Sequence, residues 1–229
     1  MVSVAIDGPA GAGKSTIARA LAGRLGYIYV DTGALYRSVG LYVLESGRDT
    51  ADPAQVSACL DEICIELKFI EGEQRVLLGG RDVSERIRTP EVSMAASRVS
   101  AVPAVRSFLF DLQRNMGKTN SIVMDGRDIG TVVLPDADVK IFLTASPEKR
   151  AQRRWKELRE KGEQVTLQQV LEDVIQRDYN DSHRETAPLR QAEDAVLIDT
   201  SELTLEESIE ALYRTVRERL DLPEGEENR

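Results

Sequence analysis

The sequence predicts an α/β fold in which a five-stranded parallel sheet is covered by helices. Short apolar runs alternate with segments whose apolar residues recur at helical spacing, beginning with residues 2–7 and 15–25. Alternation of this kind gives parallel strands joined by right-handed crossovers. With 229 residues, 41% of them hydrophobic, the chain is long enough to bury one sizeable core.

The five expected strands are short apolar runs bounded by turn or capping residues, at 2–7, 27–31, 121–125, 139–143 and 195–199. Helices are expected between them, at 15–25, 33–46, 102–115 and 147–161 and from Asp52-Pro53, Thr89-Pro90, Thr166 and Thr204 onward. Thr204 and Glu207 have the spacing of a capping box. The last two helices are expected to turn these apolar residues inward: Leu167, Val170, Leu171 and Val174, and Leu205, Ile209, Leu212 and Val216.

The pattern changes after Cys64, where apolar and other residues alternate through Ile65, Leu67 and Phe69 up to a turn at Gly79-Gly80. A period of two predicts an antiparallel meander, and inside an α/β chain it reads as an insertion. One domain is therefore expected, with a core (1–60, 90–148 and 166–229), a β insertion (about 61–89) and a short lid (about 149–165) that ends near Gly162.

Composition excludes several classes of protein. His183 is the sole histidine and Cys59 and Cys64 are the two cysteines, which excludes a typical zinc site and a Ser-His or Cys-His catalytic pair. A net charge of −9 disfavours binding to the phosphate backbone of nucleic acids. No uncharged apolar stretch approaches the length of a membrane span, and no leader is evident. We expect a monomeric cytoplasmic protein that binds neither nucleic acid nor membrane.

A phosphate-binding loop follows the first strand and opens the first helix. Gly8 to Ser15 fits the pattern G-x-x-x-x-G-K-[ST], in the strand–loop–helix context that the motif requires. Its backbone N–H groups turn toward one anion, Lys14 reaches the outer phosphates, and the Ser15 hydroxyl can bind Mg²⁺. The sequence thus predicts a P-loop NTPase fold that binds a nucleoside triphosphate and Mg²⁺ through Gly8 to Ser15.

Motifs that are absent from the chain exclude several reactions of the γ-phosphate. There is no Asn-Lys-x-Asp motif to read guanine, and a motor or helicase would need a larger chain. A small kinase remains, and phosphoryl transfer needs positioning and charge neutralisation rather than a histidine base. Asp125 ends an apolar strand, where an Mg²⁺-associated carboxylate is expected, with contact to the ion through water as one option.

Several arginines stand at strand ends or helix bends, where α/β sheets bind ligands. Arg37 and Arg127 are expected to converge on one acceptor phosphate, which the planar guanidinium fork suits. Arg153 and Arg154, with Arg150, read as a lid that brings positive charge to the transferring phosphoryl group, or as a basic helix face. The set Arg177, Asp181 and Arg184 falls on one predicted helix face, as a ligand site or an ion-paired ladder.

The chain resembles the bacterial cytidylate kinases of the nucleoside monophosphate kinase group over nearly its whole length. The similarity lies in IDGPAGAGKST, DTGALYR, RDVSERIRTPEVS, AASRVSAVPAVR, MDGRDIGTVVLPDADVKIFLTAS, RAQRRWKELREKG, QRDYNDSHR and APL. It implies ATP-dependent phosphorylation of CMP and dCMP, with ATP bound by Gly8, Pro9, Ala10, Gly11, Ala12, Gly13, Lys14, Ser15 and Thr16. Together with the charge expected at the lid, we predict a catalytic group of Lys14, Arg127, Arg153 and Arg154. The resemblance also implies roles for individual acceptor-site residues: Arg37, Arg127 and Arg184 at the phosphate, Ser97, Arg106 and Asp128 at the cytosine, and Thr32, Arg177 and Asp181 around the sugar.

The cytosine assignment has a physical rationale, because an acid can accept a hydrogen bond from the N4 amino group while an arginine donates to the O2 carbonyl. Many relatives have serine where this chain has Thr32, but the hydroxyl is kept. Two alternatives stay open. One is a P-loop kinase of another small acceptor such as shikimate or gluconate, which the meander disfavours. The other is a regulatory module that binds ATP and a protein partner without transferring phosphate.

Overall fold

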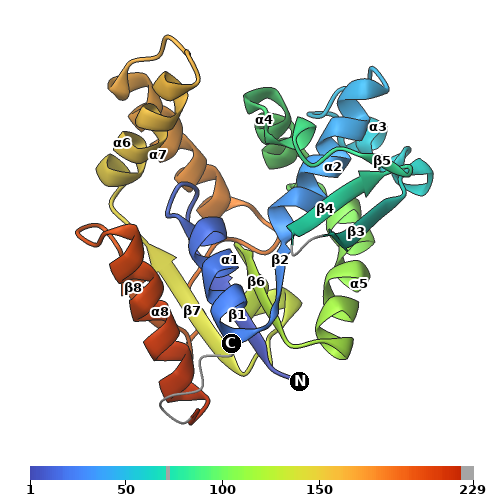
Figure 1. Ribbon diagram of the computed structural model, residues 1–229. Coiled ribbons are helices and arrows are strands. Elements are labelled where there is room, and N and C mark those ends of the chain that lie inside the picture. Colours follow the sequence, from blue (N-terminus) through green and yellow to red (C-terminus); the bar gives the residue numbers. More distant parts are fainter. Residues whose placement is uncertain (71–72, 223–229) are drawn as a thin grey trace. The chain divides into compact units, whose positions relative to one another are not determined.

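The computed structural model describes residues 1–70 and 73–222 (Figure 1). The chain packs as two compact units. The first is formed by Met1–Tyr29 together with the chain from Thr119 onward, and the second by Val30–Lys118. The first unit is therefore discontinuous in sequence and the second is one contiguous segment. The expected division into core, insertion and lid is a division by role, and it stays a prediction.

The predicted five-stranded parallel sheet is confirmed. Its strand order is β2-β6-β1-β7-β8, with β1 at the centre, and the pairs β1–β6, β1–β7 and β7–β8 are parallel. The strands are β1 (Ser3–Asp7), β2 (Ile28–Asp31), β6 (Ile122–Gly126), β7 (Val139–Thr144) and β8 (Val196–Asp199). Because parallel strands end at the same edge, the residues that follow β1 and β6 are brought to one side of this sheet.

In the described part of the first unit, four helices and one wide helical turn accompany the sheet (Figure 1). They are α1 (Lys14–Leu25), α6 (Pro147–Glu160), α7 (Leu167–His183), α8 (Leu205–Arg219) and the π-helical turn η3 (Ile129–Val133). Val4 and Ile6 on one face of β1 join Ile17 and Leu21 of α1 and Leu212 of α8 in a single buried cluster. The opposite face of β1 carries Asp7, which alternates with Ile6 along the strand.

Capping residues set where these helices begin. The capping box of Thr204 and Glu207 is confirmed, and Thr166 with Gln169 forms a second one. The prediction that Leu167 and Leu205 face inward is wrong, since they are 37% and 48% exposed. Each is the first residue of its helix, and helical side chains lean toward the N-terminus, so these two point past the packed layer.

The second unit holds the remaining helices and the antiparallel sheet β3-β4-β5, which confirms the predicted meander. Its elements are α2 (Thr32–Glu45), α3 (Pro53–Ser57), the 3-10 turn η1 (Leu60–Glu62), β3 (Ile65–Ile70), β4 (Glu73–Leu78), β5 (Arg81–Asp82), the 3-10 turn η2 (Arg86–Arg88), α4 (Pro90–Val99) and α5 (Pro103–Thr119), whose last residue belongs to the first unit. The helix that begins after Asp52 ends at Ser57, and the 3-10 turn η1 follows it, so that Val56, Leu60 and Ile63 are all buried.

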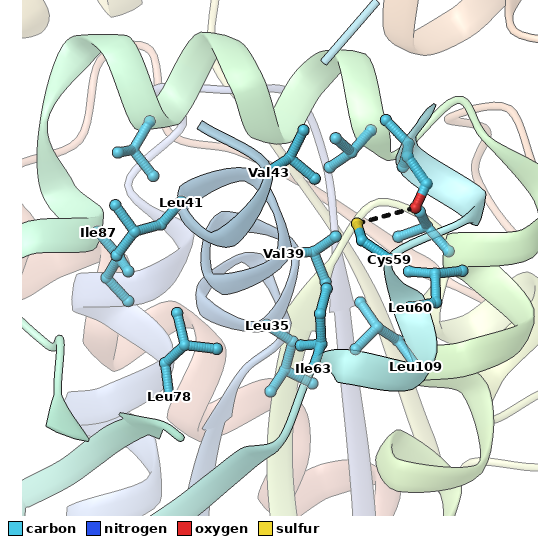
Figure 2. Packing of buried hydrophobic residues seen from close by; sticks show 14 of the residues in the cluster. Leu35, Val39, Leu41, Val43, Cys59, Leu60, Ile63, Leu78, Ile87 and Leu109 are labelled. Carbon is cyan, nitrogen blue, oxygen red and sulfur yellow. Dashed lines mark hydrogen bonds between the residues drawn. The ribbon is translucent and has the colours of Figure 1, made fainter. Parts of the chain in front are cut away.

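Figure 2 shows the core of the second unit, where α2 is central. Leu35, Val39 and Val43 recur every four residues along α2 and are fully buried, as the helical spacing predicted. Cys59 is buried beside them and its thiol donates to the Val56 carbonyl at 3.1 Å, whereas Cys64 is exposed. Neither cysteine forms a disulfide.

A single glycine determines how closely α2 and α4 pack. A Cβ placed on Gly40 would lie 2.9 Å from the Ala96 backbone nitrogen and 3.1 Å from the Ala95 Cβ. Such distances are well inside van der Waals contact, so the two helices approach as they do because residue 40 has no side chain. No helix within residues 1–70 and 73–222 is long and apolar enough to cross a membrane.

Candidate nucleotide-binding site

The phosphate loop lies where the motif predicts, between β1 and α1. Gly8 has φ 149°, and a Cβ there would lie 1.9 Å from the Leu143 carbonyl oxygen, so the loop begins packed directly against β7. Gly13 caps α1 in the left-handed region, at φ 87°. A glycine cap has no side chain to accept from the first N–H groups of the helix, which leaves them for an anion.

Lys14 is buried in this loop, with its Nζ donating to the Pro9 carbonyl at 2.7 Å. Burial and the charge of Arg127 lower the pKa of Lys14 well below its ordinary value, against the opposing charges of Asp125, Asp181 and Asp7. A phosphate placed here would favour the charged ammonium, because a nearby opposite charge raises the pKa of a lysine.

Ser15 and Asp125 meet at the start of α1, as a Mg²⁺ site requires. The Ser15 hydroxyl donates to one Asp125 carboxylate oxygen at 3.0 Å, and the Tyr29 hydroxyl donates to the other at 2.8 Å. A hydroxyl and a carboxylate are the hard oxygen ligands that Mg²⁺ binds together with phosphate oxygens and water. No group of three or more His, Cys, Asp or Glu side chains in the described chain could hold a metal by itself. These residues therefore fit an ion that arrives with a triphosphate.

Tyr29 was not predicted as a site residue. Its ring is buried in β2, and a buried tyrosine hydroxyl usually has a hydrogen-bond partner. That rule is the one signal in the sequence that could have drawn attention to it.

The loop after β6 brings together four of the predicted acceptor-site residues. Arg127 donates through Nε to Asp181 at 2.8 Å and through a terminal nitrogen to the Gly126 carbonyl at 3.2 Å. Arg184 lies 3.6 Å from Asp128, and both side chains are largely buried. Burial raises the pKa of the Asp181 carboxyl, but the charges of Arg127, Arg177 and Arg184 outweigh it, and the pKa lies below its ordinary value.

The prediction that Arg177, Asp181 and Arg184 share one helix face is wrong for Arg184. Helix α7 ends at His183, and Arg184 is extended, with φ −66° and ψ 141°. Its Nε donates to the Ala187 carbonyl at 2.7 Å. Arg184 therefore reaches Asp128 by leaving the helix.

Asp7 is a further buried acid that was not predicted. Its carboxylate accepts from the backbone N–H of Ile129 and of Gly130, each at 2.8 Å. Burial raises the pKa of Asp7 to about 6, helped by the negative charge of Asp128 and opposed by the two N–H groups and Lys14. The signal available in the sequence was a carboxylate at the end of a buried strand, directly before the phosphate loop.

The three arginines of the predicted lid all have protein partners. Arg150 is 3% exposed and bonds Asp178 through both terminal nitrogens, at 2.9 and 2.5 Å, and the Ala145 and Ala10 carbonyls. Arg153 donates to the Thr200 carbonyl at 2.7 Å, and Arg154 lies 3.3 Å from Glu157. Arg150 thus links the phosphate loop to α7 as a structural residue, while catalytic roles for Arg153 and Arg154 stay predictions.

The other predicted acceptor-site residues belong to the second unit. Thr32 is buried at the start of α2, and Arg37 pairs with the helix cap Asp31 at 2.8 Å. The Nε of Arg37 is buried with no hydrogen-bond partner in the described chain. Its N–H can therefore donate to a bound anion. Ser97 is half-buried on α4, and Arg106 on α5 lies 5.8 Å from the Tyr36 ring and donates weakly to the Ser100 carbonyl.

The model of one protein family, described as cytidylate kinase, matches residues 4–218, which is most of the chain. The chain belongs to the cytidylate kinase family. A cytidylate kinase from Caldicellulosiruptor saccharolyticus is 53% identical over 209 residues, covering 91% of this chain and 92% of the relative. A cytidylate kinase from Geobacter sp. (strain M21) is 50% identical over 223 residues, covering 96% and 94%. The resemblance to cytidylate kinases inferred from the sequence motifs is thereby confirmed.

Among solved structures, an uncharacterised protein from Eubacterium ventriosum is similar with a TM-score of 0.54 and 15% identity, over 95% of this chain and 98% of that one. At this identity the similarity concerns the fold alone. Membership of the cytidylate kinase family rests on the sequence comparisons.

Proposed function

We propose that this protein transfers the γ-phosphate of ATP to CMP and dCMP, giving ADP with CDP or dCDP. The observation that carries the proposal is the meeting of two groups of charges in the first unit. Lys14, which belongs to the phosphate loop, is close enough to Arg127, Asp125 and Asp181 for their charges to alter its pKa. A donor triphosphate and a second anionic substrate can therefore be bound at one place.

The protein's part in the reaction is positioning and charge neutralisation. Phosphoryl transfer passes through a loose transition state whose charge is spread over the phosphoryl oxygens. Lys14 and Arg127 are cations that can face those oxygens, and the N–H groups at the start of α1 bind the donor phosphates. Mg²⁺ bound with ATP, held by Ser15 and by Asp125 directly or through water, would neutralise further phosphate charge.

We assign the acceptor-binding residues as the resemblance implies. Arg37, Arg127 and Arg184 bind the acceptor phosphate, Ser97, Arg106 and Asp128 recognise cytosine, and Thr32, Arg177 and Asp181 surround the sugar. Two local observations support this assignment: the Arg37 Nε has an unused donor, and Arg184 and Asp128 are held together in the first unit. To contribute to transfer, Arg153 would release the Thr200 carbonyl and Arg154 would release Glu157, and both guanidinium groups would then donate to phosphate oxygens.

We also propose that the protein works as a monomer in the cytoplasm, with small nucleotides rather than nucleic acids as its partners. The net charge of −9 supports the second point, because an acidic body is repelled by a phosphate backbone.

A coupled assay of ADP formation with ATP, Mg²⁺ and a panel of CMP, dCMP, UMP, AMP and dTMP tests the proposal. Fast turnover with CMP and dCMP is the expected result. Fast turnover with AMP, UMP or dTMP and none with CMP would overturn the acceptor assignment. ATP binding without transfer to any monophosphate would instead favour a regulatory module.

The residue assignment is tested with Arg127→Ala. We expect turnover to fall on the order of a thousandfold, as with arginines that stabilise a transferring phosphoryl group. Arg24→Ala is the matched control, since Arg24 lies on α1 and pairs with the exposed Glu210. Equal activity of the two folded variants would remove Arg127 from the site.

A further inference from the structure

We propose that Asp7 is a positioning residue for the acceptor nucleotide, because its carboxylate holds the backbone that follows Arg127 and Asp128. The inference rests on the proposed function, since it concerns the cytosine-recognising role assigned to Asp128. It gives Asp7, at the end of β1, a part in acceptor specificity, although Asp7 belongs to the strand that leads into the donor loop.

The contact is bidentate and buried. One carboxylate oxygen of Asp7 accepts from the N–H of Ile129 and the other from the N–H of Gly130, both at 2.8 Å. The two partners are 122 and 123 residues away in sequence, and Asp7 is 4% exposed. Two consecutive N–H groups bound to one rigid carboxylate fix both the position and the direction of that backbone segment.

The same segment is held from its other side by Asp128 itself. The Asp128 carbonyl accepts from the N–H groups of Val132 and Val133, at 2.9 and 3.2 Å, which closes the wide turn η3. The backbone of Asp128 is thus restrained in two ways. Its neighbour Ile129 is bonded to Asp7, and its own carbonyl is bonded to the turn η3. Its side chain is then oriented by backbone constraints as well as by Arg184.

Packing around Gly130 shows that the contact depends on close approach. A Cβ on Gly130 would lie 3.1 Å from Lys140 Cδ and 3.4 Å from the Asp7 Oδ2 that accepts from the Gly130 N–H. A side chain there would therefore have to displace the Lys140 side chain and would stand in van der Waals contact with the carboxylate.

A carboxylate is costly to bury, and a purely structural position could hold a serine or an asparagine. Here the two N–H groups need two acceptors, and one carboxylate supplies both. An asparagine offers a single oxygen, and its NH₂ group would face one of the two N–H donors. Asp7→Asn is therefore a change of nearly equal shape that removes one of the two holds on the segment.

The test compares the full-length wild type, Asp7→Asn and the control Asp138→Asn in steady-state kinetics with ATP, CMP and UMP. Asp138 is a suitable control because its carboxylate also bonds the β1 backbone, accepting from the Ser3 N–H at 2.7 Å and the Ser3 hydroxyl at 2.8 Å. We expect Asp7→Asn to raise the KM for CMP about tenfold, which corresponds to a loss of about 1.4 kcal/mol in the contact that a displaced Asp128 makes with the acceptor. In Asp7→Asn the KM for ATP should change little, and the preference for CMP over UMP should become smaller. In Asp138→Asn the KM for CMP and the preference for CMP over UMP should equal those of the wild type.

The outcomes separate the inference from the proposed function. If the wild-type protein does not phosphorylate CMP, the proposed function is refuted, whatever the two variants do. A wild type that phosphorylates CMP, with an Asp7→Asn variant of unchanged CMP KM and unchanged CMP preference, overturns the role of Asp7. An equal rise in the KM values for CMP and ATP also overturns it, since Asp7 would then act on the phosphate loop.

Where Asp7→Asn does not fold, Gly130→Ala tests the same contact with the carboxylate left in place. A selective rise in the CMP KM supports the inference. An unchanged CMP KM in folded Gly130→Ala overturns it.

Discussion

Replacing Asp178 with alanine should destabilise the protein by about 3 kcal/mol, because the change leaves the Arg150 guanidinium buried without its counter-ion. Arg150 is 3% exposed on α6, and Asp178 of α7 accepts from both of its terminal nitrogens. An uncompensated buried charge is among the most destabilising changes that a single substitution produces.

The magnitude follows from what is lost and what remains. Removing one partner of a buried ion pair costs about 3–5 kcal/mol. Asp178 is 26% exposed at its side chain, and Arg150 keeps its bonds to the Ala145 and Ala10 carbonyls. Both facts place the expected cost at the lower end of that range.

The assay is denaturant unfolding followed by tryptophan fluorescence. Trp155, the sole tryptophan, lies on α6 and donates to the Val165 carbonyl at 3.0 Å, so it reports on this helix pair directly. Glu202→Ala is the matched control, since the Lys149–Glu202 pair also joins α6 to another segment but is exposed. Loss of an exposed pair should cost about 0–1 kcal/mol. If Asp178→Ala loses no more stability than Glu202→Ala, the reasoning about the buried charge is refuted.

Three further changes have expected outcomes. Gly40→Ala should destabilise by about 1–3 kcal/mol in thermal or chemical unfolding, because its Cβ would meet the Ala96 nitrogen at 2.9 Å. Gly23→Ala on α1 should stabilise by about 0.5–1 kcal/mol, since nothing lies within 4 Å of its Cβ; the same sign for both would contradict this account. For Asp7, a pKa raised from 3.8 to about 6 means that the folded state binds the proton more tightly than the unfolded state. The unfolding free energy of the wild type, relative to Asp7→Asn, should therefore be highest below pH 4 and fall by about 3 kcal/mol as the pH rises through 6, and a flat difference would refute the shift.

The fold was predictable from the sequence because its signals are local. Strand and helix periods, the Thr204 capping box and the alternation after Cys64 each need only a short window of residues, and all agree with the structure. The errors lie where tertiary position decides. Leu167 and Leu205 fit the apolar period, but they stand at the first position of a helix, where they stay 37% and 48% exposed.

The site was predictable in part for the same reason. The phosphate loop is one continuous motif, whereas the contacts that orient its surroundings join distant residues. Tyr29 and Asp125 are 96 residues apart, and Asp7 and Ile129 are 122 apart. No periodicity or spacing rule relates such pairs. Arg150 shows the same difficulty. Its sequence context suited a cation in a mobile lid, whereas in the structure it is buried and its ion pair with Asp178 joins α6 to α7.

The discontinuity of the first unit has a consequence for synthesis on the ribosome. Strand β1 ends at Asp7, whereas its two neighbours in the sheet, β6 and β7, begin at Ile122 and Val139 and so emerge much later. At ordinary translation rates that is a delay of roughly ten seconds. The segment Val30–Lys118 is complete before either partner exists. Strand β1 and the phosphate loop that follows it are therefore made before the segment Val30–Lys118 but find their place in the sheet after it, and nascent β1 must stay unpaired and unaggregated until β6 and β7 are made.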